Sequence, residues 1–206
     1  GSGAPVGIAD GAACGCFGRE EAAKALARTL AEAVLTAGGE NRVAFCAFGE
    51  AGSSRWSCPL TESLADVLAC IDASPVQRGG DHAAGLARAL RLLNRRTVSE
   101  RLGRRAAVVV LSGGETFPAE NGTRALCLAE ALKGTMGEEM PAVFGAALSP
   151  EERRACGAEV IAVGLWDGGS TLLSALASDA GARFTFEKIE TAEAVTSAVL
   201  NRIGLR

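Results

Sequence analysis

The segment Ala106-Ala-Val-Val-Val-Leu111, followed by the turn Ser112-Gly-Gly-Glu115, carries the most continuous apolar strand pattern of this chain. Strands that read as unbroken apolar runs are usually covered on both faces, as in parallel sheets. On either side of this segment, strand and helix patterns alternate almost throughout the chain. The sequence therefore predicts an α/β fold built on a mostly parallel sheet.

Further strands are expected at Pro5–Ala9, Arg42–Phe48, Ser54–Cys58, Glu159–Leu165 and Arg183–Glu187. The turn at residues 49–52 is short enough only for a hairpin, so Ser54–Cys58 should run antiparallel to Arg42–Phe48.

Helices are expected where apolar residues recur at helical spacing. The first should begin near Arg19, because two acidic residues follow in its first turn. A short helix should cover Glu151–Cys156, after the favourable N-terminal pair Ser149-Pro150. The predicted apolar faces are, in chain order, Leu26, Leu30, Val34 and Leu35; Leu64, Val67, Leu68 and Ile71; Leu86, Leu90 and Leu93; Ala125, Leu128, Ala129 and Leu132; Leu173, Leu176, Ala177 and Ala180; and Val195, Val199 and Ile203.

The chain is expected to form one domain over residues 4–204, because no repeat or low-complexity linker interrupts the pattern. Residues 1–3 look like a remnant of expression. The connection Gly134–Leu148 is longer than usual, so residues 134–156 are expected to contain an insertion with its own binding role.

Composition argues against two classes of partner. With 21 basic and 24 acidic residues, the net charge of −3 gives no broad attraction to nucleic acid or to anionic membrane. No apolar run approaches the roughly 20 residues that span a bilayer. We therefore expect a protein partner, no nucleic acid and no direct membrane insertion by this domain.

The chain has seven cysteines, which are many for a cytosolic domain of this size. Cys46 lies inside an apolar strand and is expected to be a buried free thiol. The cysteines that could form disulfides are Cys14, Cys16, Cys58, Cys70, Cys127 and Cys156. Asn121-Gly-Thr123 is a glycosylation sequon, relevant if the protein is secreted. Both features favour an oxidising compartment.

Three segments in order, Asp10-Gly-Ala-Ala-Cys14, Arg78-Gly-Gly-Asp-His82 and Val108–Glu115, resemble the metal-site skeleton of a von Willebrand factor A (vWA) domain, also called integrin I-like. The family's three loops normally read Asp-x-Ser-x-Ser, Gly-Gly-Thr-Asn and Thr-Asp-Gly. The resemblance covers about residues 4–204. It implies a Rossmann-like three-layer sandwich, with helices flanking a six-stranded, mostly parallel sheet that has one antiparallel edge strand.

The resemblance also implies a metal site that has degenerated. Asp10 matches the family's first Asp, and Asp81 stands in place of the Thr. The remaining ligand positions are occupied by Ala12, Cys14, His82 and Gly113. Mg²⁺ and Mn²⁺ need hard oxygen ligands, so Asp10 and Asp81 with water could hold only a weak Mg²⁺ ion. No cofactor is therefore expected.

Other chemistry is conceivable at the same place. Thiolate and imidazole suit Zn²⁺, so Cys14, Cys16 and His82 with Asp10 and Asp81 could bind a softer metal. Cys14, His82 and either Asp could also form a nucleophilic set. Against both stands the simpler reading that Cys14 or Cys16 pairs with another cysteine such as Cys156, and that His82 is a polar loop residue.

The expected function is non-catalytic protein–protein recognition or adhesion, independent of metal, within a larger secreted or cell-surface protein. Candidate partner-binding residues at the rim of the altered site are His82, Glu115 and Trp166, since aromatic residues at a rim can anchor a partner. The Ala-, Arg- and Gly-rich composition beside many cysteines is similar to that of adhesins from apicomplexan parasites. Two alternatives stay open: an intracellular vWA scaffold subunit of a multiprotein complex, and a soft-metal or thiol-based site.

Overall fold

The structure is a computed structural model that describes residues 10–49, 57–75, 80–96, 105–113, 121–135, 149, 156–165, 171–187 and 191–205. For residues 10–19 it describes the backbone only.

A parallel sheet of three strands lies at the centre of the described residues, in the order β1 (Ala107–Ser112), β2 (Glu159–Leu165) and β3 (Arg183–Phe186). Val110 lies opposite Ala162 in the register between β1 and β2. The middle strand is buried from Val160 to Leu165, as expected for a strand with neighbours on both edges and helices over both faces. All three strands confirm sequence predictions to within one residue.

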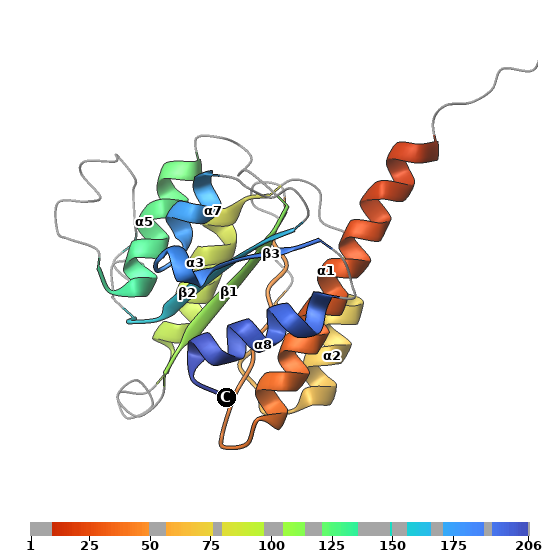
Figure 1. Cartoon of the computed structure of the whole chain (residues 1–206). Coiled ribbons are helices and arrows are strands. Elements are labelled where there is room, and N and C mark those ends of the chain that lie inside the picture. Colours follow the sequence, from red (N-terminus) through yellow and green to blue (C-terminus); the bar gives the residue numbers. More distant parts are fainter. Residues whose placement is uncertain are drawn as a thin grey trace, which may run out of the picture.

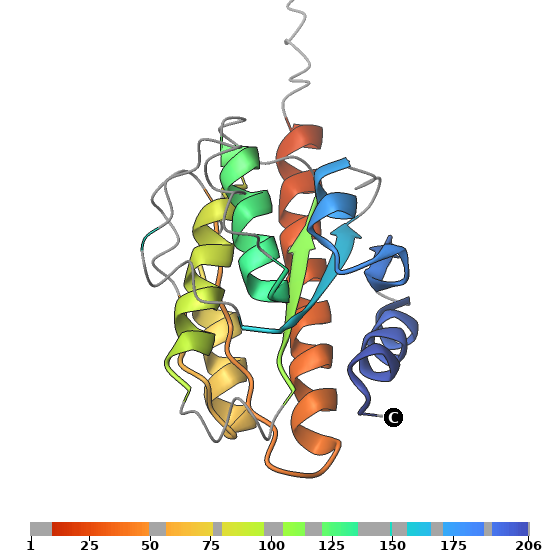
Figure 2. The same ribbon diagram turned by 90° about the vertical axis from the view of Figure 1, so that its left-hand side faces the viewer.

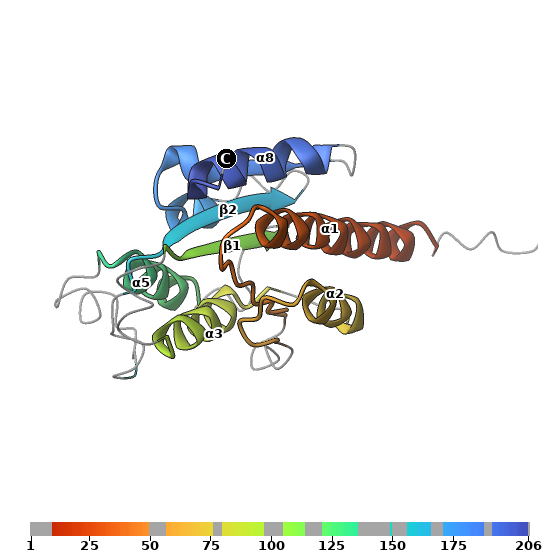
Figure 3. The same ribbon diagram turned by 90° about the horizontal axis from the view of Figure 1, so that it is seen from below.

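Helices cover both faces of this sheet. They are α1 (Asp10–Thr36), α2 (Leu64–Ala73), α3 (His82–Asn94), α5 (Asn121–Lys133), α7 (Thr171–Leu176) and α8 (Ala192–Ile203), with a short 3-10 helix at Ala180–Ala182. Figures 2 and 3 show α3 and α5 on one side of β1 and β2, and α8 on the other. The helix α1 packs against α2 and α8 (Figure 1). The layered α/β architecture that the sequence predicts is confirmed.

The core forms where the predicted apolar helix faces meet the sheet. Leu26 of α1, Leu90 of α3, Leu128 of α5 and Leu173 of α7 are fully buried in one cluster with the strand β2. Each such side chain contributes about 1.5–3 kcal/mol by leaving water. Periodicity therefore predicts which residues fill the interior.

The expected hairpin is confirmed in its antiparallel course. Val43 and Thr61 form one antiparallel bridge, and Cys46 and Ser57 form another. These are isolated bridges, whereas two full strands of a six-stranded sheet were predicted. The prediction of six strands thus exceeds what the described residues show, because residues 5–9 and 50–56 lie outside them.

Two helices have other bounds than predicted. The helix α1 begins at Asp10 and not near Arg19, so residues 10–18 are helical where a loop was expected. Two alanines in this stretch favour the helix, and an acidic residue in the first turn suits its dipole. The helix α7 ends at Leu176, before Ala177 and Ala180. The predicted short helix at 151–156 and most of the segment 134–156 fall outside the described residues.

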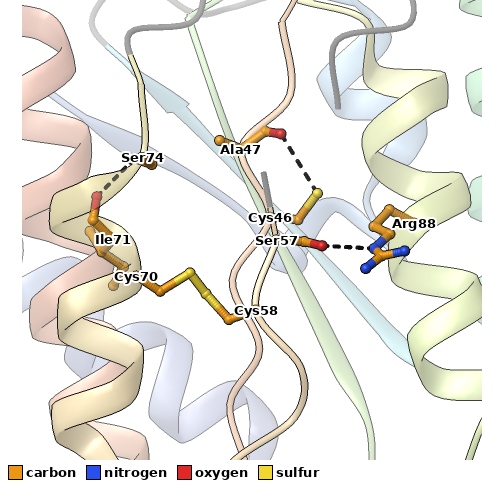
Figure 4. Close-up of a disulfide and its surroundings, with 8 residues drawn as sticks. All are labelled: Cys46, Ala47, Ser57, Cys58, Cys70, Ile71, Ser74 and Arg88. Carbon is orange, nitrogen blue, oxygen red and sulfur yellow. Dashed lines mark hydrogen bonds between the residues drawn. A yellow bond between two sulfur atoms is a disulfide. The ribbon is translucent and has the colours of Figure 1, made fainter. Parts of the chain in front are cut away.

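A disulfide links Cys58, next to the antiparallel bridges, to Cys70 on α2 (Figure 4). Their Cα atoms are 6.4 Å apart, within the range of disulfide geometry. Beside the bond, Val67 and Ile71 of α2 pack against Ala31 of α1. The bond therefore ties the 57–61 segment to the α1–α2 part of the core. The sequence alone could not predict that Cys58 pairs with Cys70, because the six candidate cysteines can be paired in many ways.

We predict that the double substitution Cys58→Ser/Cys70→Ser lowers the free energy of unfolding by about 2–3 kcal/mol, because the bond closes a short loop in the unfolded chain. Urea unfolding measures this change. A reductant should destabilise the unmodified protein by a similar amount and leave the double variant unchanged. Equal effects of the reductant on both proteins would contradict the assignment of this disulfide.

Candidate functional site

The candidate site begins at the N-terminus of α3. Asp81 is the N-cap residue: its Oδ1 accepts a hydrogen bond from the backbone N–H of Ala84 at 3.1 Å. Its own N–H donates to the carbonyl of Gly49 at 2.7 Å. With only 5% of its surface exposed, Asp81 is built into the structure. Short polar side chains that cap a helix in this way typically contribute about 1 kcal/mol.

His82 links this helix start to the end of β1. It is 1% exposed, and its two ring nitrogens lie 3.0 Å from the Gly80 carbonyl oxygen (Nδ1) and 2.8 Å from the Ser112 hydroxyl (Nε2). A carbonyl oxygen only accepts, so Nδ1 carries the hydrogen. In the neutral ring Nε2 then accepts from the Ser112 O–H. This hydrogen bond joins the N-terminus of α3 to the C-terminus of β1.

Burial holds the imidazole in its neutral form. It lowers the pKa of His82 below its ordinary value, against the opposing effects of the Gly80 carbonyl and of the negative charge on Asp81. A neutral ring is what the hydrogen bond from Ser112 requires. The lowered pKa and the hydrogen-bond geometry therefore both indicate a neutral His82.

Phe48 brings a third segment to the same place. Its ring centroid lies 5.2 Å from that of His82, with the two rings tilted by 52°. Opposite, Gly85 of α3 lets the ring approach, because a Cβ at that position would lie 2.9 Å from two Phe48 ring atoms. Any larger residue at 85 would force Phe48 to move. The segment 43–48, α3 and β1 thus meet around one buried histidine.

The described side chains at this place, which do not include that of Asp10, do not by themselves form a site for a hard divalent cation. Asp81 Oδ1 is engaged by the helix N-terminus, and the two His82 nitrogens are engaged by Gly80 and Ser112. Gly113, the residue after Ser112, is exposed and has no side chain that could bind a metal. Within the described ranges, no three His, Cys, Asp or Glu side chains gather in one place. Mg²⁺ requires an octahedral set of oxygen ligands, which these side chains do not supply.

The sequence placed some of these residues well and missed others. Asp81, His82 and Gly113 lie at the carboxyl end of β1, as predicted. The roles of Ser112 and Phe48 were missed. Ser112 could have been found, since it stands where the family's third loop has Thr and keeps the hydroxyl. No local signal marks Phe48, because its contact with His82 depends on tertiary packing.

The other predicted site residues lie partly or wholly outside the described residues. Asp10, Ala12, Cys14 and Cys16 lie in the first turns of α1, and the structure describes only their backbone. Glu115 and Trp166 lie outside the described residues, so their approach to the site stays a prediction. Asn121 opens α5 and is partly buried, and its glycosylation likewise stays a prediction.

The cysteines correct the expected pairing. Cys127 and Cys156, which were among the disulfide candidates, are thiols. Cys156 Sγ lies 3.2 Å from the Asn94 Oδ1, and Cys127 is fully buried in α5. Cys46 is a thiol as predicted, but only partly buried. Burial raises the pKa of Cys46 and of Cys127, so neither thiol is activated as a nucleophile.

We predict that Ser112→Ala lowers the free energy of unfolding by about 1–3 kcal/mol, because it leaves a buried His82 nitrogen without the hydroxyl that donates to it. Denaturant unfolding measures the change. Ser174→Ala is the matched control: that hydroxyl accepts from Arg183 at the surface, so its loss should alter stability by less than about 0.5 kcal/mol. Equal effects of the two substitutions would contradict a structural role for the His82–Ser112 bond.

We also predict that acidification lowers the free energy of unfolding at pH values above those at which the protein's carboxylates are protonated. The folded-state pKa of His82 lies below the unfolded value of about 6.5, so the native state binds fewer protons. The stabilisation is complete above pH 6.5 and is lost as the pH falls towards the folded pKa. Chemical unfolding between pH 7 and 5 should show a slope of at most about 1.4 kcal/mol per pH unit. The variant His82→Gln should lack this slope; an equal slope in both proteins would assign it to other groups.

Comparison with known proteins bears on the fold. No protein-family model matches the chain, and no curated protein matches it in sequence. The solved structures that resemble it include two at 13% identity. The pilus adhesin SpaC from Lactobacillus rhamnosus GG aligns over 90% of this chain with a TM-score of 0.62, and the chain spans 28% of the SpaC length. The vWF domain of the type V pili tip protein Mfa5 from Porphyromonas gingivalis aligns over 91% of this chain and 90% of its own, with a TM-score of 0.55. The chain therefore has a vWA-like fold.

Proposed function

We propose that this chain is a non-catalytic protein-recognition module of a secreted or cell-surface protein, and that it works without a metal ion. The observation that carries this proposal is the hydrogen bond between His82 and Ser112. It fastens α3 to β1 at the place where the resemblance to vWA domains puts a metal. The polar groups that the structure describes there are directed towards one another and hold the rim together.

The adhesive part of the proposal draws support from the two solved structures, which belong to a pilus adhesin and to a pilus tip protein. Their identity of 13% to this chain supports the fold, and the function is our inference from it. A disulfide between Cys58 and Cys70 favours an oxidising compartment over the alternative of an intracellular scaffold. No described helix is both long and apolar enough to cross a membrane.

We place the partner-binding surface at the rim formed by the carboxyl end of β1 and the turn that follows it. Ligands of open α/β sheets bind at this edge. Gly113 is exposed there, and a Cβ added to it would meet nothing within 4 Å. In this proposal Glu115 and Trp166 belong to the same rim, and His82 supports it from beneath. The finer architecture that we propose is a six-stranded sheet, completed by residues outside the described ranges.

A photo-crosslinking residue at Gly113 should trap a discrete partner protein on intact cells, because the rim faces outward there. The same residue at Asn201, exposed near the C-terminal end of α8, should trap none. Gel shifts followed by mass spectrometry measure the adducts. Identical adducts from both positions, or a Gly113 adduct that EDTA abolishes, would contradict the proposed surface or its independence of metal.

We predict that Mg²⁺, Mn²⁺ and EDTA leave the melting temperature unchanged. A cation present at 100 times its dissociation constant would add about 2.7 kcal/mol to the native state, which a melting curve detects easily. Asp81→Asn is the matched variant, because it removes the described carboxylate nearest the site. A rise in melting temperature with Mg²⁺ that disappears in Asp81→Asn would mean that a working metal site exists.

A further inference from the structure

The outward face of the helix α3 carries a stripe of arginines. Arg88, Arg91 and Arg95 recur at the spacing i, i+3 and i+7, which places them on one face, opposite the buried side of the helix. Arg91 and Arg95 are exposed. Arg88 is half-buried, and its Nε donates a hydrogen bond to the Ser57 hydroxyl at 2.9 Å. The helix itself contains no acidic residue.

These arginines form no ion pair in the part of the chain that the structure describes. Like charges three or four residues apart on a helix repel one another, so the stripe opposes folding of the isolated chain. An acidic residue at the same spacing would offset this repulsion, but α3 has none. The stripe therefore suits a negatively charged surface of a partner.

The neighbouring helix α2 shows the opposite charge. Asp66 and Asp72 are exposed on α2, Glu62 is exposed just before it, and the helix contains no basic residue. Asp72 pairs with Arg28 of α1 at 2.6 Å, whereas Glu62 and Asp66 have no ion pair within the described ranges. Apart from its two acids, α2 exposes only alanines. A long arginine side chain can therefore reach these carboxylates without obstruction.

The two charged helices belong to the same face of the domain. Figure 3 shows α2 and α3 in one layer, on the side of the sheet away from α8. The segment 57–61 lies between them, because Cys58 is bonded to Cys70 of α2 and Ser57 accepts from Arg88 of α3 (Figure 4). No described ion pair joins α2 to α3. One face thus presents an acidic flank and a basic flank, separated by this segment.

We infer that this face binds a second copy of the chain in a two-fold symmetric pair. A two-fold axis that lies in the interface, along the segment 57–61, sets α3 of each copy against α2 of the other. Arg91 and Arg95 of one copy then face Glu62 and Asp66 of the other. The same contacts recur on the opposite side of the axis, as in any isologous interface.

Such a pair should be weak and sensitive to salt. Single exposed ion pairs contribute little, but arginine can bind a carboxylate through two parallel hydrogen bonds, and the symmetry repeats each contact. The pairing goes beyond the proposed recognition function and does not depend on it. The proposed partner-binding rim lies at the carboxyl end of β1 around Gly113, whereas this face consists of α2, α3 and the segment 57–61.

Sedimentation equilibrium on the unmodified chain tests this pairing. We expect a monomer–dimer equilibrium whose dissociation constant rises at least about tenfold between about 0.1 M and about 1 M salt, because the screening length falls from about 10 Å to about 3 Å. Arg91→Glu/Arg95→Glu makes the basic flank acidic, and Glu62→Lys/Asp66→Lys makes the acidic flank basic. Each variant should raise the dissociation constant at least about tenfold at low salt, because like charges then face each other.

A mixture and a control separate specific pairing from a general effect of charge. In an equimolar mixture of the two reversed variants, an acidic α3 meets a basic α2 on both sides of the axis. A heterodimer should therefore form where neither variant dimerises alone. Arg105→Glu/Arg183→Glu changes the net charge as much as Arg91→Glu/Arg95→Glu does, at exposed residues of other elements, and should leave dimerisation nearly unchanged.

Three results would overturn the pairing. A chain that stays monomeric up to about 1 mM at low salt would leave the arginine stripe to an acidic partner of another kind. A dimer that survives both charge reversals would place the contact on another face. Reversed variants that stay monomeric in the mixture would show that these charges do not meet across an interface. If a reversed variant does not fold, as circular dichroism would reveal, the neutral Arg91→Gln/Arg95→Gln should still weaken the dimer.

Discussion

The hydrogen bond between Ser112 and His82 holds together the part of the domain at the carboxyl end of β1, where the helix α3 begins. It joins a strand end to a helix start, and Asp81 joins the same helix start to Gly49. A single such bond adds only about 0.5–1.5 kcal/mol to a fold stabilised by about 5–15 kcal/mol. Its importance lies in its position: without it, Nε2 of a buried imidazole loses its described partner, and the direct link between α3 and β1 is lost.

We propose that this contact lets a vWA-like frame work without a metal ion. A bound cation organises loops because several ligands converge on one charge. In the described part of this site, the two nitrogens of the buried His82 imidazole bond to Gly80 and Ser112. Phe48 closes the site on one side. Gly113, the residue that follows β1, is exposed at the surface. The arrangement favours a rigid rim for a protein partner.

The sequence predicted features that depend on local patterns of residues better than features that depend on contacts between distant segments. The strand β2 was placed to the residue, because an apolar run of strand length is a local pattern. The α1 start was missed by nine residues, from Arg19 to Asp10, since alanines and glycines give conflicting local signals there. Asp81 and His82 were placed at the site by their match to family loops. The partner Ser112 and the disulfide Cys58–Cys70 arise from tertiary contacts, which local patterns do not encode.

The protonation state of the single histidine tests the account most directly. Nitrogen-15 NMR of the imidazole at pH 7 distinguishes a nitrogen that carries hydrogen from one that accepts. We expect a neutral ring with hydrogen on Nδ1 and an accepting Nε2, unchanged by Mg²⁺. The Nε2 signal should move in Ser112→Ala. A charged ring, a hydrogen on Nε2, or a signal that shifts with Mg²⁺ would contradict a metal-free site held by the His82–Ser112 bond.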